Sequence, residues 1–235
     1  MEENFNNIEW NRIDAPDIDK NMLGVIQSLA SYDFEARKEA LTDLFDMIWH
    51  QGTLSWSASF AVPFLIERLQ QEPEAELLEN ILLDLVHLGT GSSFCDAHQN
   101  LSIYEDKRNT LEFQQQMQEE LEGVRATYQA VYKGVNIYFD LLEHESPQVR
   151  IAAAYTLSCC KSEAARICTK LYARFSCEPD ELVKATISLC LAFLSKSTPV
   201  QIAFFEQVLK SNESDIVKLS AAITLAYIAS EHMYA

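Results

Sequence analysis

Apolar residues recur in the second half of the chain with a period of 34 residues. Val149, Val183 and Val217 each begin a stretch in which apolar or small residues return at offsets 0, 3, 4, 7, 8 and 11. This spacing marks one broad face of an α-helix. A fixed period of this length is typical of stacked helical repeats, in which each unit buries its apolar face against its neighbours.

The same register continues into the first half of the chain. Ala36 and Leu77 begin equivalent stretches, so five second helices are predicted. The helix that precedes each of them is expected at 18–30, 56–70, 118–143, 163–175 and 199–210. The sequence therefore predicts an all-α protein, a right-handed α–α superhelix of about five helical hairpins that forms a single domain over residues 1–235.

Glycine, proline and one long step mark the expected irregularities. Gly52 and Gly89 follow predicted second helices, where glycine commonly caps a helix C-terminus. Pro63 falls inside the predicted 56–70 helix, so a kink or a late start is expected there. The step of 72 residues from Leu77 to Val149 contains a polar insertion at about 90–112. We expect a long loop or a partly helical flap in this insertion.

The most regular repeat reads Glu-Ser-Pro-Gln-Val-Arg-Ile-Ala-Ala-Ala-Tyr-Thr-Leu over residues 145–157. A proline before a Val-Arg pair, followed by an alanine-rich second helix, resembles the HEAT repeat. The stretches Trp-His-Gln-Gly-Thr at 49–53 and Ala-Val-Pro-Phe-Leu at 61–65 are similar to those of small bacterial HEAT-like repeat proteins. The resemblance covers most of the chain, and it implies a curved helical solenoid that binds protein. It implies no particular reaction.

Composition adds a strong acidic bias. The 35 Asp and Glu residues exceed the 18 Lys and Arg residues by 17. Residues 1–115 hold 21 acidic and 7 basic residues, a net charge of -14, whereas residues 116–235 hold 14 and 11, a net charge of -3. Such charge repels nucleic-acid phosphates and anionic lipid and attracts cationic partners, so we expect a basic protein partner, no nucleic acid and no membrane. A merely solubilising surface would have the same composition.

The repeat register places polar residues of the first two second helices at equal offsets. Asp43 and Asp84 hold offset 7, Glu39 holds offset 3, and Asp46 and His87 hold offset 10. Residues at equal offsets lie on adjacent helices about 10 Å apart, so these side chains are expected on one face. Three interpretations follow: an acidic lining with ordinary polar contacts, a docking site for a basic partner, or a divalent-metal or acid–base site.

Two tryptophans and a histidine surround the expected helix end at Gly52. His50 is predicted to place a favourable charge at a helix C-terminus rather than to act as a catalyst. Trp49 and Trp56 are expected to pack the first two repeats together or, if exposed, to anchor a partner. The candidates for partner binding are therefore Glu39, Asp43, Asp46, Trp49, His50, Trp56, Asp84 and His87.

Established motifs for catalysis, phosphate or dinucleotide binding and metal binding do not occur in the sequence, so no catalytic residue, metal ligand or cofactor is assigned. The six cysteines include no C-x-x-C pair and are expected to pack as thiols in a reducing compartment. The chain starts without the pattern of a signal peptide, and its uncharged stretches are too short to cross a bilayer. A soluble cytoplasmic protein is expected.

Three functional hypotheses follow from the sequence, and the third is a structural or assembly component that self-associates through an exposed end of the solenoid. The first is a non-enzymatic protein–protein interaction module whose acidic N-terminal half binds a basic partner protein, as an inhibitor or a scaffold. The second is a small hydrolytic or nucleic-acid-modifying enzyme, of the HEAT-like DNA glycosylase type, that uses Asp43, Asp46, Asp84 and His87. Those glycosylases present a basic groove, which contrasts with the charge of this chain. We expect a monomer or a weak homo-oligomer.

Overall fold

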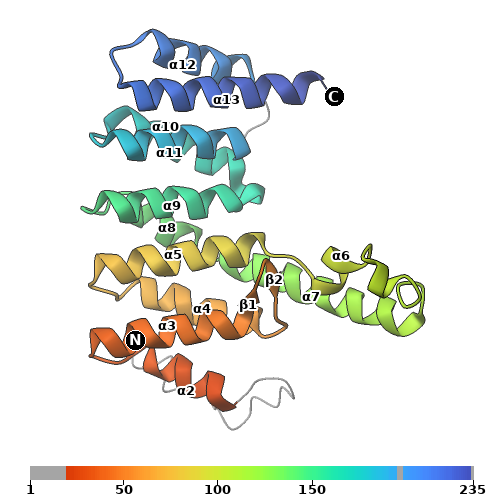
Figure 1. Ribbon diagram of the computed structural model, residues 1–235. Coiled ribbons are helices and arrows are strands. Elements are labelled where there is room, and N and C mark those ends of the chain that lie inside the picture. Colours follow the sequence, from red (N-terminus) through yellow and green to blue (C-terminus); the bar gives the residue numbers. More distant parts are fainter. Residues whose placement is uncertain (1–19, 195–197, 234–235) are drawn as a thin grey trace. The chain divides into compact units, whose positions relative to one another are not determined.

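The computed structural model describes residues 20–194 and 198–233, which form α-helices joined by short connections and one small hairpin (Figure 1). The first two positions of the predicted 18–30 helix lie outside these residues. The all-α prediction is confirmed. The helices are α2 Lys20–Ser28, α3 Phe34–Ile48, α4 Ala58–Leu69, α5 Ala75–Thr90, α6 Phe94–His98, α7 Leu111–Tyr132, α8 Val135–Leu141, α9 Pro147–Cys159, α10 Ala164–Cys177, α11 Glu181–Leu194, α12 Pro199–Lys210 and α13 Asp215–Met233.

The chain forms two compact units, and α5 contributes to both. The first unit contains the chain up to Glu72 together with His87–Lys133. The second unit contains Pro73–Val86 and the chain from Gly134 onwards. Each unit has its own buried apolar core, and each is described by itself.

The second unit is a stack of helical hairpins, as the period of 34 residues predicts. Helices α8 and α9, α10 and α11, and α12 and α13 pack as pairs, and α11 packs on both α9 and α13 (Figure 1). Val149, Val183 and Val217, which begin the repeats, are fully buried. Proline is the first residue of α9 and of α12. A backbone N–H at this position has no acceptor within the helix, so proline costs no hydrogen bond there.

Buried threonine hydroxyls tie successive second helices of this unit together. Thr156 Oγ1 donates to the Leu82 carbonyl at 3.0 Å, and Thr224 Oγ1 donates to the Ser188 carbonyl at 2.9 Å. Both threonines hold offset 7 of their repeat, and both acceptors hold offset 5 of the preceding repeat. Offset 7 therefore faces the preceding helix, which explains why small neutral side chains occupy it here.

The first unit differs from a regular pair of repeats. Helix α2 packs on α3, whereas α4 packs along α7. Between α3 and α4 the chain forms an antiparallel hairpin of β1 Trp49–His50 and β2 Thr53–Leu54. Its two-residue loop is Gln51–Gly52, with φ angles of 50° and 91°. Two successive positive φ angles are typical of a type I′ turn, and glycine reaches them without steric cost. The prediction that Gly52 caps a helix is therefore wrong.

The insertion forms an arm, defined here as residues 91–122. It contains α6, a 3-10 turn at Ser102–Tyr104 and the first half of α7, and it extends away from α3 and α4 in Figure 1. Contacts between the rings of Phe94, Tyr104 and Phe113 form its small core. The expected insertion at about 90–112 thus contains α6 and the 3-10 turn, and α7 already begins at Leu111.

Three local predictions need correction. The predicted 118–143 helix is divided into α7 and α8 at Lys133–Gly134, and glycine at position 134 leaves room for the buried ring of Tyr138. Helix α4 begins at Ala58, five positions before Pro63, so the expected late start is wrong. Gly89 lies inside α5 rather than after its end.

Each unit contains the same buried cluster of two arginines and one glutamate. In the first unit, Arg37 Nε and Nη2 bind the Glu72 carboxylate at 2.9 and 2.8 Å, and Arg68 Nε lies 2.9 Å from Glu72 Oε2. Arg37 Nη1 also donates to the carbonyls of Ser31 and Tyr32, at the start of its own helix.

The corresponding residues of the second unit repeat this arrangement. Arg150 Nε and Nη2 bind the Glu178 carboxylate at 2.9 and 2.7 Å, and Arg174 Nε donates to it at 2.8 Å. Arg150 Nη1 donates to the carbonyls of His144 and Glu145. A two-pronged guanidinium pair fixes both distance and direction, so each cluster sets the spacing between consecutive repeats.

Candidate functional site

One face of α3 carries a row of exposed carboxylates, here called the acidic row: Glu39, Asp43 and Asp46. Spacings of four and three residues keep the three side chains on one side of the helix. The opposite side is anchored by Leu44 and Ile48, which are fully buried. Among the residues that the structure describes, no lysine or arginine forms an ion pair with the row. The row is therefore an uncompensated negative surface.

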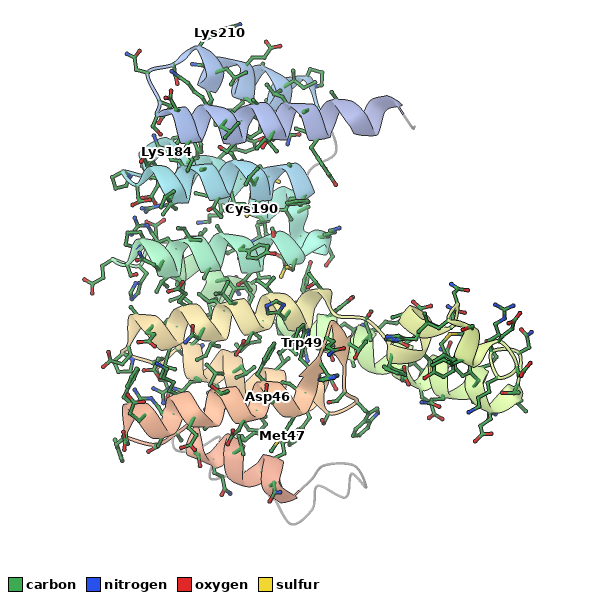
Figure 2. The ribbon with its side chains drawn as sticks, in the orientation of Figure 1. Asp46, Met47, Trp49, Lys184, Cys190 and Lys210 are labelled. Carbon is green, nitrogen blue, oxygen red and sulfur yellow. The ribbon has the colours of Figure 1, made fainter. Side chains whose placement is uncertain are left out.

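Three rings form an aromatic cluster next to the C-terminal end of this row. Phe45 and Trp49 are stacked, with ring centroids 5.1 Å apart and an angle of 17° between the planes. His87 lies 5.1 Å from Trp49 and 5.7 Å from Phe45, tilted by about 50° to both rings. Figure 2 shows Asp46 and Trp49 close together at this end of α3. The cluster holds Trp49 in a fixed, half-exposed position beside a carboxylate.

The hairpin presents the remaining candidates of the first unit. His50 is exposed in β1 and directly follows Trp49, the C-cap residue of α3. Trp56 is 53% exposed and lies against Gly123 of α7, whose Cα would carry a Cβ only 3.8 Å from it. Packing and exposure were the alternatives expected from the sequence for Trp49 and Trp56. In the structure each tryptophan packs against a neighbour and also keeps part of its side chain exposed.

Asp84 differs from the other candidates in its burial and in the unit to which it belongs. It is half-buried in the part of α5 that belongs to the second unit, and it has polar or ring interactions of its own. His87, one turn later, belongs to the first unit. The structure thus brings Trp49 and His87 together and aligns Glu39, Asp43 and Asp46 on α3, whereas Asp84 lies in the part of α5 that belongs to the second unit.

No group of three or more His, Cys, Asp or Glu side chains in the described part of the chain is arranged to hold a metal ion. Two of the helical cysteines, Cys159 and Cys190, also lack the properties of nucleophiles. Burial raises the pKa of the Cys159 thiol to about 11 and that of the Cys190 thiol to about 12. Thiols with such pKa values stay protonated at neutral pH and are poor nucleophiles. All six cysteines are free.

A polar cluster that the sequence did not reveal fastens α6 to α7 within the arm. The Glu120 carboxylate accepts hydrogen bonds from Ser93 Oγ and the Cys95 N–H, both at 2.8 Å, and from Cys95 Sγ at 3.2 Å. Burial alone would raise the pKa of Glu120, but these hydrogen bonds outweigh it and lower the pKa below the usual 4.5. Ser93 and Cys95 are more than 20 positions away from Glu120, so no local pattern indicates the contact.

Phe45 is a further residue that sequence analysis missed. It stands four positions before Trp49, a spacing that places two rings on one side of a helix. This spacing was visible in the sequence, but the hairpin that carries Trp49 was not.

The described helices include no segment with the length and apolar character needed to span a membrane.

Comparison with known proteins yields little beyond this geometry. No family model matches the chain. No curated protein matches it either. Two crystal structures described as engineered proteins, both targets of the Northeast Structural Genomics Consortium, are similar in structure at 16% and 18% sequence identity. Each match covers 90% of this chain and 100% or 98% of the other, with TM-scores of 0.42 and 0.41, which are too low to support an argument.

Proposed function

We propose that the protein is a non-enzymatic protein–protein interaction module whose acidic N-terminal half binds a basic partner protein, as an inhibitor or a scaffold. The observation that carries the proposal is the acidic row of α3, because its three exposed carboxylates have no ion pair in the described part of the chain. Lysine and arginine side chains of a partner would compensate this charge, and long-range attraction would accelerate the encounter.

The aromatic cluster supports the same site. Tryptophan is over-represented among the residues that dominate binding energy in protein interfaces. Trp49 is held by its stack with Phe45 and its contact with His87, so little side-chain freedom would be lost on binding. A partner guanidinium or ammonium group that neutralises Asp46 can also approach the face of a neighbouring ring, which adds a cation–π attraction. The site therefore suits a partner that presents arginine or lysine beside apolar surface.

The test is affinity capture from native lysate with two matched triple variants. The first replaces Glu39→Gln, Asp43→Asn and Asp46→Asn and removes the acidic row. The second replaces Glu105→Gln, Asp106→Asn and Glu112→Gln, which are exposed acidic residues of the arm. Both variants change the net charge by the same amount, so only the position of the charge differs. Captured proteins are eluted by a salt step and identified by mass spectrometry.

We expect the unaltered chain and the arm variant to capture the same basic protein and the α3 variant to lose it. Binding of the purified partner should weaken steeply as salt rises, because screening shortens the range of the attraction. Equal loss in both variants would show that net charge alone attracts cationic proteins and that α3 is no specific site. A captured partner whose affinity does not change with salt would contradict the proposal.

A further inference from the structure

One side of α9, α11 and α13 is uncharged in a chain whose net charge is -17. In the repeat register this side consists of offsets -1, 2, 6 and 10 of each helix, which lie within one narrow sector of the helical circumference. We call these twelve positions the apolar face, and they are Gln148, Ile151, Tyr155, Cys159, Leu182, Ala185, Leu189, Phe193, Ile216, Leu219, Ile223 and Tyr227.

Large side chains of the apolar face are exposed to solvent. Seven of its members have exposed fractions between 39% and 60%. Isolated apolar residues on a surface need no explanation, but a contiguous patch does. The seven are Tyr155, Leu182, Phe193, Ile216, Leu219, Ile223 and Tyr227.

The three helices bring these residues into one surface. Helix α11 packs between α9 and α13, and Figure 1 shows the three running side by side. The rings of Phe193 and Tyr227, which hold the same offset on neighbouring helices, are in contact with centroids 5.4 Å apart. The hydrogen bond from Thr224 to the Ser188 carbonyl fixes the register between the same two helices.

The corresponding positions of α3 show that this composition is not a property of the repeat. There the four offsets hold Glu35, Lys38, Thr42 and Asp46, three of which are charged. The same helical sector is therefore charged in α3 and apolar in α9, α11 and α13.

We propose that the apolar face binds a second copy of this chain and forms a symmetric dimer. The exposed area supports a second copy as the partner. A large side chain has roughly 200 Å² of surface. Seven such side chains, each about half exposed, therefore present roughly 700 Å² of apolar surface on each copy. Two copies would bury roughly 1,400 Å², within the range of specific protein interfaces. Charge supports it too, because two chains that each carry -17 can approach without strong local repulsion only where both surfaces are uncharged.

A two-fold axis fits the arrangement of the three helices. With the axis running along α11 in the plane of the contact, the two α11 helices meet each other, and α9 of each copy meets α13 of the other. Phe193 and Leu189 then lie nearest the axis, and the larger exposed side chains of α13 cover the edges. The contact is closed, so association stops at the dimer.

The apolar contact has a salt dependence opposite to that of the proposed acidic site. Raising NaCl from about 0.1 M to about 1 M shortens the Debye length from about 10 to about 3 Å. Screening weakens attraction to a basic partner, whereas it relieves the repulsion between two acidic copies. The dimer is therefore expected to tighten as salt rises, and its failure would leave the proposed function of the acidic row untouched.

Sedimentation equilibrium of the full chain tests the proposal over a range of concentrations at both salt levels. Phe193→Asp places two carboxylates near the axis and should weaken the dimer by at least a hundredfold. Leu219→Asp, at the most exposed of the seven large side chains, is a second variant for which folding is not at risk. Ile103→Asp, a 72% exposed position of the arm, is the matched control and should leave association unchanged. Circular dichroism establishes that each variant is folded.

The proposal stands if the unaltered chain and Ile103→Asp form dimers that strengthen with salt while the two face variants remain monomeric. It is overturned by a chain that stays monomeric at every concentration and salt level. A dimer that survives both face variants, or one that dissociates as salt rises, would equally overturn it, because the contact would then lie elsewhere.

Discussion

At the scale of single residues, the buried ion pairs show what a sequence reveals and what it hides. The Val-Arg pair that begins the third repeat is visible in the sequence, and so is Arg37 at the same offset of the first. Their partners are not visible, because Glu72 and Glu178 lie 35 and 28 positions away, after an intervening helix. In retrospect both glutamates hold offset -5 of the following repeat. One occurrence in each half of the chain is too little for a pattern.

The first prediction concerns the Arg150–Glu178 pair. Glu178→Gln removes the negative charge that compensates two arginines in a buried place, so it should lower the free energy of unfolding by about 3–5 kcal/mol. Glu163→Gln is the matched control, because Glu163 also binds an arginine, Arg166, but at the surface. Its cost should stay below about 1 kcal/mol. Urea unfolding followed by circular dichroism measures both, and equal costs would show that the buried cluster does not stabilise the stack.

At the scale of elements, helical periodicity was a sufficient guide wherever the chain is regular. The second helices were predicted because their buried stripes recur, and the stack of α9, α11 and α13 follows from them. The hairpin was missed because its strands have two residues each, too few to show alternation. Gln51-Gly52 was read as the end of a helix, although glycine supplies the positive φ of a tight turn equally well.

The second prediction concerns the arm. Glu120→Ala leaves Ser93 Oγ and the Cys95 N–H without their acceptor, at a local cost of about 1–3 kcal/mol. Hydrogen exchange of the amides of α6 should therefore become faster, while that of α3 should not change. Glu122→Ala is the matched control, since Glu122 accepts only a surface hydrogen bond from Gln118 among the contacts described. Unchanged protection of α6 in Glu120→Ala would mean that the ring contacts alone hold the arm.

The third prediction is the pH dependence of the same contact. The pKa of Glu120 is lower in the folded chain than its usual 4.5, so its contribution is complete above the unfolded pKa and disappears as pH falls through the folded pKa. Protection of α6, corrected for the intrinsic exchange rate, should thus be constant from neutral to mildly acidic pH and fall only below about 4.5. The Glu120→Ala chain should show no such step. Loss of protection that begins near pH 6–7 would point to another group.

At the scale of the whole molecule, the candidate site was predictable in composition but not in arrangement. Equal offsets placed Asp43 with Asp84 and Asp46 with His87. That prediction assumes that the second helices of all repeats pack in the same way. The structure instead divides α5 between two units, so Asp84 belongs to the second unit while His87 joins Trp49 in an aromatic cluster of the first. The alignment of the three carboxylates of the acidic row could be predicted, because they lie on a single helix whose geometry follows from the sequence.

The last prediction follows from the distribution of charge over the whole chain. A net charge of -17 destabilises a compact state through self-repulsion, and screening relieves this repulsion. Thermal unfolding of the Phe193→Asp chain, in which dimerisation cannot contribute, should therefore shift upward by about 2–4 °C for each kcal/mol gained between about 0.1 and 1 M NaCl. The buried Arg–Glu clusters oppose this trend only weakly, because solvent ions do not reach them.

Removing the acidic row reveals how much of this repulsion comes from α3. With Glu39→Gln, Asp43→Asn and Asp46→Asn added to Phe193→Asp, the melting temperature at low salt should rise and its dependence on salt should flatten. The same number of neutralised carboxylates on the arm should have a smaller effect, because the arm extends away from the helices of its unit (Figure 1). If both sets act equally, the repulsion belongs to the total charge. If the α3 substitutions raise the melting temperature more than the arm substitutions, the acidic row is a local concentration of charge that lowers the stability of the fold. Such a cost in stability is expected of a surface that serves in binding.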